Sequence, residues 1–202
     1  MSGMGIFDVL KRKMKRVEAP PEPPDPLLLR ISAVYPSGPV RRGSLKSIPR
    51  HLDLTGKGPV IDEVMIFDSR DHWFCLFLGC RALGLPFEIG LRTGTSTGET
   101  SPPDWFIEPV TRVANGIGDG ATCAPGVTWV IGSPLGGPAS PYTGFLTLPD
   151  FEFGNLDPAC VLQLVPISQV ELGLRGNELD QLCDRVQGDR SRMTGVSAVP
   201  NQ

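Results

Sequence analysis

The sequence predicts a mixed α/β domain in which helices cover a central sheet. Seven apolar segments have the length of strands and are bounded by Gly and Pro. Several are near-continuous apolar runs without alternation, which is typical of strands buried on both faces of a sheet. Two further segments carry the start signals of helices. Together these observations favour one layered domain.

The predicted strands follow one another along the chain, separated by turn residues. The chain has 24 glycines and 21 prolines, many of them between the apolar segments, so a loop-rich fold is expected. The predicted strands are Leu27 to Tyr35, Ile61 to Phe67, Trp73 to Cys80, Phe87 to Arg92, Val127 to Ile131, Gly144 to Leu148 and Cys160 to Ile167.

Two stretches are predicted to be helical. The first starts with Ser-Pro-Pro-Asp at 101–104, where Ser101 is a candidate N-cap, and its apolar residues recur at helical spacing through Val113. The second starts at Ser168, which is predicted to form a capping box with Glu171. Glycines at 173 and 176 weaken its middle, so Asn177 is expected to cap a separate segment through residue 186. Structural roles are expected for Trp73, Trp105, Ser168 and Glu171.

Length, charge and composition limit the class of protein. The chain has 202 residues, 40% of them hydrophobic, and a formal net charge of -3, which describes one globular domain able to form its own core. No apolar run approaches the ~20 residues that span a bilayer, and no secretory signal pattern is present, so we expect a cytoplasmic protein. The five cysteines lack Cys-x-x-Cys spacing and are predicted to be buried thiols. No metal or other cofactor is expected.

The N-terminal residues differ from the rest in composition. Residues 1–17 combine five basic side chains and one acid with an apolar stripe, which predicts a short basic amphipathic helix. Residues 18–26 (EAPPEPPDP) are expected to form an extended, acidic linker. The folded domain is expected at 27–188 and a flexible tail at 189–202. The basic residues of this arm are Lys11, Arg12, Lys13, Lys15 and Arg16.

Three roles are open for the basic arm. The alternatives are a solvated tail, an anchor that binds a partner or, weakly, an anionic membrane, and a contact with nucleic acid. The apolar stripe opposite the charges favours docking, because a solvating tail does not need one. Direct binding of nucleic acid by the protein is not expected.

Two motifs resemble chemical sites, but both favour structural interpretations. Gly116 to Ala121 spells G-x-G-x-x-A, yet a predicted helix precedes it where a dinucleotide site needs a strand, so a flexible surface loop is favoured. Asp68, Asp71 and His72 form an acid-imidazole cluster without further ligands nearby, and we interpret it as a turn whose acids cap backbone amides. A hydrolase or metal enzyme at this cluster stays a third alternative. The sequence contains no G-x-S-x-G, P-loop or HExxH motif, which disfavours an enzyme.

Four sequence features occur in an informative order between about Gly58 and Val186. They are the strand at 61–67 with the following Asp-His-Trp at 71–73, the strand PFEIGLR at 86–92, Pro-Asp-Trp at 103–105, and VLQLVPIS at 161–168 followed by Glu-Leu at 171–172. In this order they resemble the Suppressor-of-fused (SUFU) domain family. Gly90 and Pro166 depart from the residues usual in the family, which are Thr and Gly.

The resemblance implies a single α+β domain with a mixed, largely antiparallel central sheet flanked by helices, which acts by binding and not by catalysis. Small bacterial members resemble immunity proteins that neutralise a cognate toxin, such as a nuclease, of a polymorphic toxin system, and this is the leading hypothesis. The alternative is a non-catalytic adaptor that recruits a partner through the arm. The arm has a net charge of +4, so the rest of the chain has a net charge of -7, which would be attracted to a basic surface of a toxin. The candidate partner-binding residues are Asp62, Glu63, Asp68 and Asp71 in the domain and Lys11, Arg12, Lys13, Lys15 and Arg16 in the arm.

Overall fold

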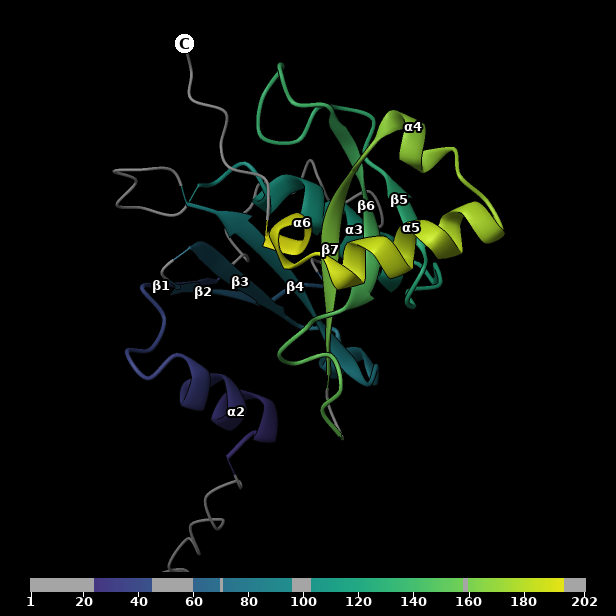
Figure 1. The fold of residues 1–202 in the computed structure, drawn as a ribbon. Coiled ribbons are helices and arrows are strands. Elements are labelled where there is room, and N and C mark those ends of the chain that lie inside the picture. The colour runs from purple at the N-terminus through teal and green to yellow at the C-terminus, as the bar shows by residue number, and fades with distance from the viewer. Residues whose placement is uncertain (1–23, 45–59, 70, 96–102, 158–159, 195–202) are drawn as a thin grey trace, which may run out of the picture.

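The chain folds around a seven-stranded sheet with helices on both faces (Figure 1). The structure, a computed structural model, describes residues 24–44, 60–69, 71–95, 103–157 and 160–194. The strands lie in the order β1-β2-β3-β4-β7-β6-β5, and all neighbours are antiparallel except the parallel pair β4 and β7. The predicted mixed, largely antiparallel α+β fold is therefore confirmed. The strands are β1 (Arg41–Ser44), β2 (Glu63–Asp68), β3 (His72–Leu78), β4 (Phe87–Gly94), β5 (Thr128–Val130), β6 (Tyr142–Pro149) and β7 (Cys160–Ser168).

The helices form two layers, one on each side of the sheet (Figure 1). In the described part of the chain, every helix is too short or too polar to cross a lipid bilayer. The helices are α2 (Pro26–Val34), α3 (Ile107–Gly118), α4 (Gln169–Leu172), α5 (Asn177–Gly188) and α6 (Arg190–Thr194), and a 3-10 turn spans Arg81–Leu83.

Alternate side chains of each central strand enter different cores, because successive residues of a strand point to opposite faces. On β3, Cys75 and Phe77 belong to the core that α3 covers, whereas Phe74 and Leu76 belong to the core beneath α2. Over β6 and β7, the face shared with α2 is covered instead by α4, α5 and α6. The sheet is thus buried on both faces, as the continuous apolar runs predict.

The segment at 27–35, predicted to be a strand, is the helix α2. The Asp25 side chain accepts a hydrogen bond from the Leu27 amide at 2.9 Å, and Pro26 occupies the first turn, so both start signals of a helix are present. Leu27 and Ile31, four residues apart, are the buried positions. The additional apolar residues of this segment extend around the helix and mask its period in the sequence.

The helix starts differ in how well local sequence defines them. The predicted capping box of Ser168 and Glu171 is present at the start of α4. Helix α5 begins at Asn177, but Asn177 does not cap it: Gly176 occupies the N-cap position with a φ of 52°, and no side chain caps the helix. Helix α3 begins at Ile107, and the expected cap at Ser101 lies outside the described residues.

Two segments expected to be flexible are packed. Residues 190–194 of the predicted tail form α6, whose buried Met193 joins the core over β6 and β7. A single buried residue leaves no periodic pattern in the sequence, which explains why this helix escaped prediction. The G-x-G-x-x-A glycines lie in the last turns of α3, where a Cβ on Gly116 would stand 3.0 Å from the Trp129 ring and one on Gly118 would overlap Val60. These glycines therefore permit close packing and do not form a surface loop.

Candidate functional site

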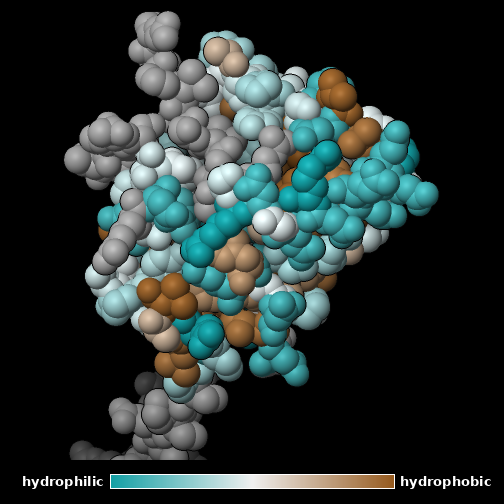
Figure 2. Space-filling view, viewed as in Figure 1, coloured by the Kyte–Doolittle hydropathy of each residue, from teal (hydrophilic) through white to brown (hydrophobic). Residues whose placement is uncertain are grey.

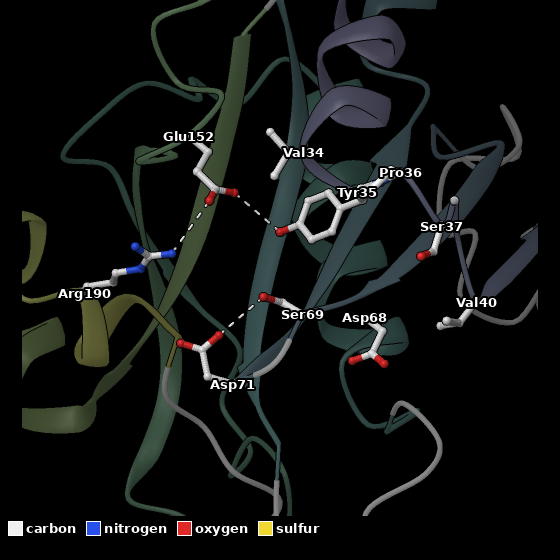
Figure 3. Close-up of a pocket in the computed structure, with 11 residues that line it drawn as sticks. Val34, Tyr35, Pro36, Ser37, Val40, Asp68, Ser69, Asp71, Glu152 and Arg190 are labelled. Atoms are coloured by element: carbon white, nitrogen blue, oxygen red, sulfur yellow. Dashed lines mark hydrogen bonds and ion pairs between the residues drawn. The ribbon is translucent and has the colours of Figure 1, made fainter.

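A pocket of about 910 Å³ opens where the C-terminal end of α2 meets the β2–β3 turn (Figure 3). Its walls come from three separate parts of the chain: the α2–β1 connection, the end of β2 with the following turn, and residues near 152 and 190. The lining residues are Val34, Tyr35, Pro36, Ser37, Gly38, Val40, Asp68, Ser69, Asp71, Glu152 and Arg190.

Local structure fixes the α2–β1 wall of the pocket. Helix α2 ends when the Tyr35 amide bonds the Ile31 carbonyl at 2.8 Å, and Gly38 then turns the chain with a φ of 73°. The Val40 amide donates to the Ile66 carbonyl at 2.8 Å and so begins the pairing of β1 with β2. The connection is thereby held beside Asp68, the last residue of β2.

The floor beneath the pocket is a buried arginine whose hydrogen-bonding groups are all used. Arg92 on β4 is 0% exposed, and its guanidinium has five N–H donors. Nε and Nη2 donate to the two carboxylate oxygens of Asp150 at 2.8 and 2.9 Å, and Nη2 also donates to Glu152 at 2.9 Å. Nη1 donates to the Tyr35 hydroxyl at 3.0 Å and to His72 Nε2 at 2.6 Å. Five donors meet five acceptors, which is the condition under which a buried charge is tolerated.

Aromatic rings enclose the same guanidinium. Its Cζ lies 4.5 Å from the ring centre of Phe74 and 4.1 Å from that of Phe151, so the cation is placed between two π faces. Tyr35 stacks on Phe74 with ring centres 5.7 Å apart. Burial raises the pKa of Tyr35 to about 12, so its hydroxyl stays protonated at neutral pH.

His72 links this floor to the pocket mouth and is fully engaged. Nε2 accepts from Arg92, so the ring proton is on Nδ1, which donates to Asp71 Oδ1 at 2.7 Å. Burial, followed by the charge of Arg92, lowers the pKa of His72, and the hydrogen bond from His72 lowers the pKa of Asp71. A neutral imidazole with both nitrogens occupied cannot accept a proton from a substrate without breaking the network.

Asp150 shapes the loop that carries Glu152 to the pocket. Besides the two bonds from Arg92, Asp150 Oδ1 accepts the amides of Glu152 at 2.9 Å and Phe153 at 3.0 Å. The Glu152 carboxylate then lies within 3.4 Å of the Tyr35 hydroxyl and 3.7 Å of Arg190 (Figure 3). Arg92 and Asp150 neutralise each other below, so the described residues that line the pocket carry three carboxylates and one guanidinium, a formal charge of -2.

This arrangement offers acceptors to a cation and apolar surface beside them. Asp68 is exposed and the Asp71 side chain is 67% exposed, so both carboxylates face solvent. Within the described residues, no group of three or more His, Cys, Asp and Glu side chains is arranged to hold a metal ion. The cluster lies in the connection between β2 and β3, as expected, and Asp71 there accepts hydrogen bonds from the side chains of His72 and Ser69, the latter at 3.4 Å, and from its own backbone amide.

The other predicted site residues lie elsewhere. Asp62 and Glu63 sit at the opposite end of β2 from Asp68, a separation of roughly 17 Å for six residues of strand. Glu63 forms an ion pair with Arg42 of β1. Trp73 and Trp105 belong to the core on the α3 face. The five basic arm residues, Lys11, Arg12, Lys13, Lys15 and Arg16, and also His51, lie outside the described residues.

Sequence reasoning missed four residues that build the site: Tyr35, Arg92, Asp150 and Glu152. Arg92 carried a usable signal, because an arginine inside a buried apolar strand requires an acidic partner. The partner itself had no such signal, since Asp150 lies 58 residues away in sequence.

Comparisons with known proteins agree with this architecture. A chain in the crystal structure of the Sufu–Fu complex superposes with a TM-score of 0.58 at 17% sequence identity, covering 72% of this chain and 75% of that chain. A putative SUFU homolog from Neisseria gonorrhoeae FA 1090 also superposes with a TM-score of 0.58, at 16% identity, covering 87% of this chain and 96% of that one. No protein-family model matches the sequence, and no curated protein matches it. The chain therefore has the fold of a SUFU-like domain.

Proposed function

We propose that this domain binds a protein partner, and that the pocket beside Tyr35 receives a basic segment of that partner. The observation that carries the proposal is the pocket of about 910 Å³, whose described lining residues have a formal charge of -2. The fold supports it, since one of the similar structures is a complex of Sufu with another protein, Fu.

The chemistry of the walls suits an arginine or lysine side chain. The carboxylates of Asp68 and Asp71 are accessible acceptors for a guanidinium or ammonium group. Val34, Pro36 and Val40 provide apolar surface for the methylene stem of such a residue. The network below leaves no imidazole available for acid-base chemistry at His72, which favours binding over catalysis.

The sharpest form of the proposal is an immunity protein that neutralises a cognate bacterial toxin in the cytoplasm. A toxin that cleaves nucleic acid carries basic residues where its substrate binds, and these are complementary to the acidic pocket. The negative charge of the folded part speeds the encounter of two such proteins.

Neutralising the pocket acids tests the proposal. The double variant Asp68→Asn/Asp71→Asn is expected to weaken binding of a toxin encoded beside this chain by about two- to thirtyfold, because each exposed ion pair contributes about 0.2–1 kcal/mol. Isothermal titration calorimetry on the co-purified proteins measures the loss, and growth of cells that express the toxin measures protection. The matched control is Asp62→Asn, which removes an exposed acid at the other end of β2 and is expected to bind normally. Equal affinity of the double variant and the control would contradict the role of the pocket, and a neighbouring toxin that neither binds nor is inhibited would overturn the immunity role.

A further inference from the structure

The chain carries its own basic segment, complementary in charge to the pocket. Residues 1–17 contain five basic residues and a single acid, whereas the described residues of the pocket walls carry a formal charge of -2. Three of the five lysines of the whole chain, Lys11, Lys13 and Lys15, belong to this arm. The acidic pocket therefore has a candidate ligand in the same molecule.

The tether between the arm and the domain has sufficient length. Position 17 lies eight residue steps before Asp25, the cap of α2, and at the rise of about 3.1 Å per residue of a Pro-rich segment these steps span roughly 25 Å. The pocket begins at Val34 and Tyr35, at the far end of a nine-residue helix that is about 14 Å long. A segment of this reach, laid back along α2, is long enough to bring the arm to the pocket.

Apolar side chains lie along that path. Leu29 and Val40 are each 54% exposed and Val34 is 38% exposed, although all three are large hydrophobic residues. Figure 2 shows hydrophobic surface over α2, next to the point where the described chain begins. The apolar stripe predicted for the arm consists of Ile6, Leu10, Met14 and Val17. Charge and apolar surface are therefore both matched between the arm and this face of the domain.

We propose that residues 11–16 occupy the acidic pocket in cis, so that a protein partner must displace the arm in order to bind. This proposal rests on the pocket being the partner-binding site. A short tether gives an effective concentration on the order of millimolar, so an arm with an intrinsic Kd of about 0.1–1 mM fills the pocket about half to nine-tenths of the time. The apparent Kd of a competing basic segment then rises by about two- to tenfold.

Zero-length carbodiimide cross-linking of the full chain tests the contact directly. This chemistry joins a lysine amine to a carboxylate that already touches it, and the chain has only five lysines as possible donors. We expect peptides linking Lys11, Lys13 or Lys15 to Asp68, Asp71 or Glu152 within one chain, and their loss in about 1 M salt, where the Debye length falls to about 3 Å. Links spread equally over exposed acids such as Asp62, or found only between isotopically distinguishable chains, would overturn the proposal.

A binding cycle separates the arm from the pocket. The probe is a hexa-arginine peptide, titrated into the full chain, an arm variant (K11Q/R12Q/K13Q/K15Q/R16Q), the pocket variant (D68N/D71N) and their combination. We expect the arm variant to bind about two- to tenfold more tightly than the unmodified chain, and this gain to vanish when the pocket acids are absent, because the two changes are coupled. A gain that persists without the pocket acids reflects net charge alone and overturns docking in cis. If the arm variant binds the peptide no more tightly than the unmodified chain, but D68N/D71N still weakens binding, docking in cis fails while the proposed function stands. If D68N/D71N does not change the affinity in either background, both proposals fail.

Discussion

Replacing Arg92 with methionine removes all five donors of the buried guanidinium while leaving an apolar stem between Phe74 and Phe151. Asp150, whose side chain is completely buried, is then left without the cation that compensates it. Removing one partner of a buried ion pair costs about 3–5 kcal/mol, a large share of the roughly 5–15 kcal/mol that stabilises a domain. The Tyr35 hydroxyl and His72 Nε2 lose a donor as well, so the upper part of this range is expected.

Urea unfolding followed by circular dichroism measures the loss. With an m-value of about 2–3 kcal/mol/M, the Arg92→Met midpoint is expected to fall by about 1–2.5 M at constant slope. Arg112→Met is the control, because Arg112 pairs with Glu108 on the exposed surface of α3 at 2.6 Å and its removal costs about 0.5 kcal/mol or less. If Arg92→Met shifts the midpoint no more than Arg112→Met does, the buried network does not stabilise the fold as argued.

Three further changes test other parts of the structure. The free energy of unfolding is expected to fall as pH drops below about 6.5, because the pKa of His72 is lowered in the folded protein and the unfolded chain therefore binds more protons there. Urea titrations at pH 7.5 and 5.5 measure this fall, and His72→Gln should make it smaller. Gly79→Ala should lower the free energy of unfolding by more than about 2 kcal/mol, since Gly79 has a φ of 147° and an added Cβ would overlap the Val60 carbonyl. Gly188→Ala is the control: it has open space around it and should leave the melting temperature unchanged or raise it slightly. Ser168→Ala removes one half of the capping box with Glu171 and should cost about 0.5–2 kcal/mol by thermal unfolding, an effect that would be absent if the box did not stabilise α4.

Local signals made much of this fold predictable from sequence. The apolar runs that became β2 to β7 are short and bounded by turn residues, and the Ser168 capping box lies within four consecutive residues. Helix α2 was mistaken for a strand, because its leucines extend around the helix and hide the spacing of Leu27 and Ile31. Sequence patterns therefore predict those helices and strands whose structure is determined by residues close to one another in the chain.

The site was predictable only in part, because it is assembled from distant segments. Asp68 and Asp71 stood out in the sequence and do line the pocket. Glu152 joins them only through the pairing of β4 with β7, and Tyr35 lies 117 residues from it. Asp62 and Glu63 look equivalent to Asp68 in composition, yet six residues of extended strand place them at the far end of β2.

The single parallel pair, β4 with β7, has a consequence for how binding competence arises during folding. On one side of it, β1 to β4 are neighbours in chain order, and on the other side β5, β6 and β7 are too, so each half of the sheet forms from hairpin-like local pairings. The pocket takes Tyr35, Asp68 and Asp71 from the first half and Glu152 and Arg190 from the second. An intermediate in which both halves have formed but have not yet joined would contain nearly all the secondary structure and still lack the pocket, so under the proposed function ligand binding would report the joining of the two halves.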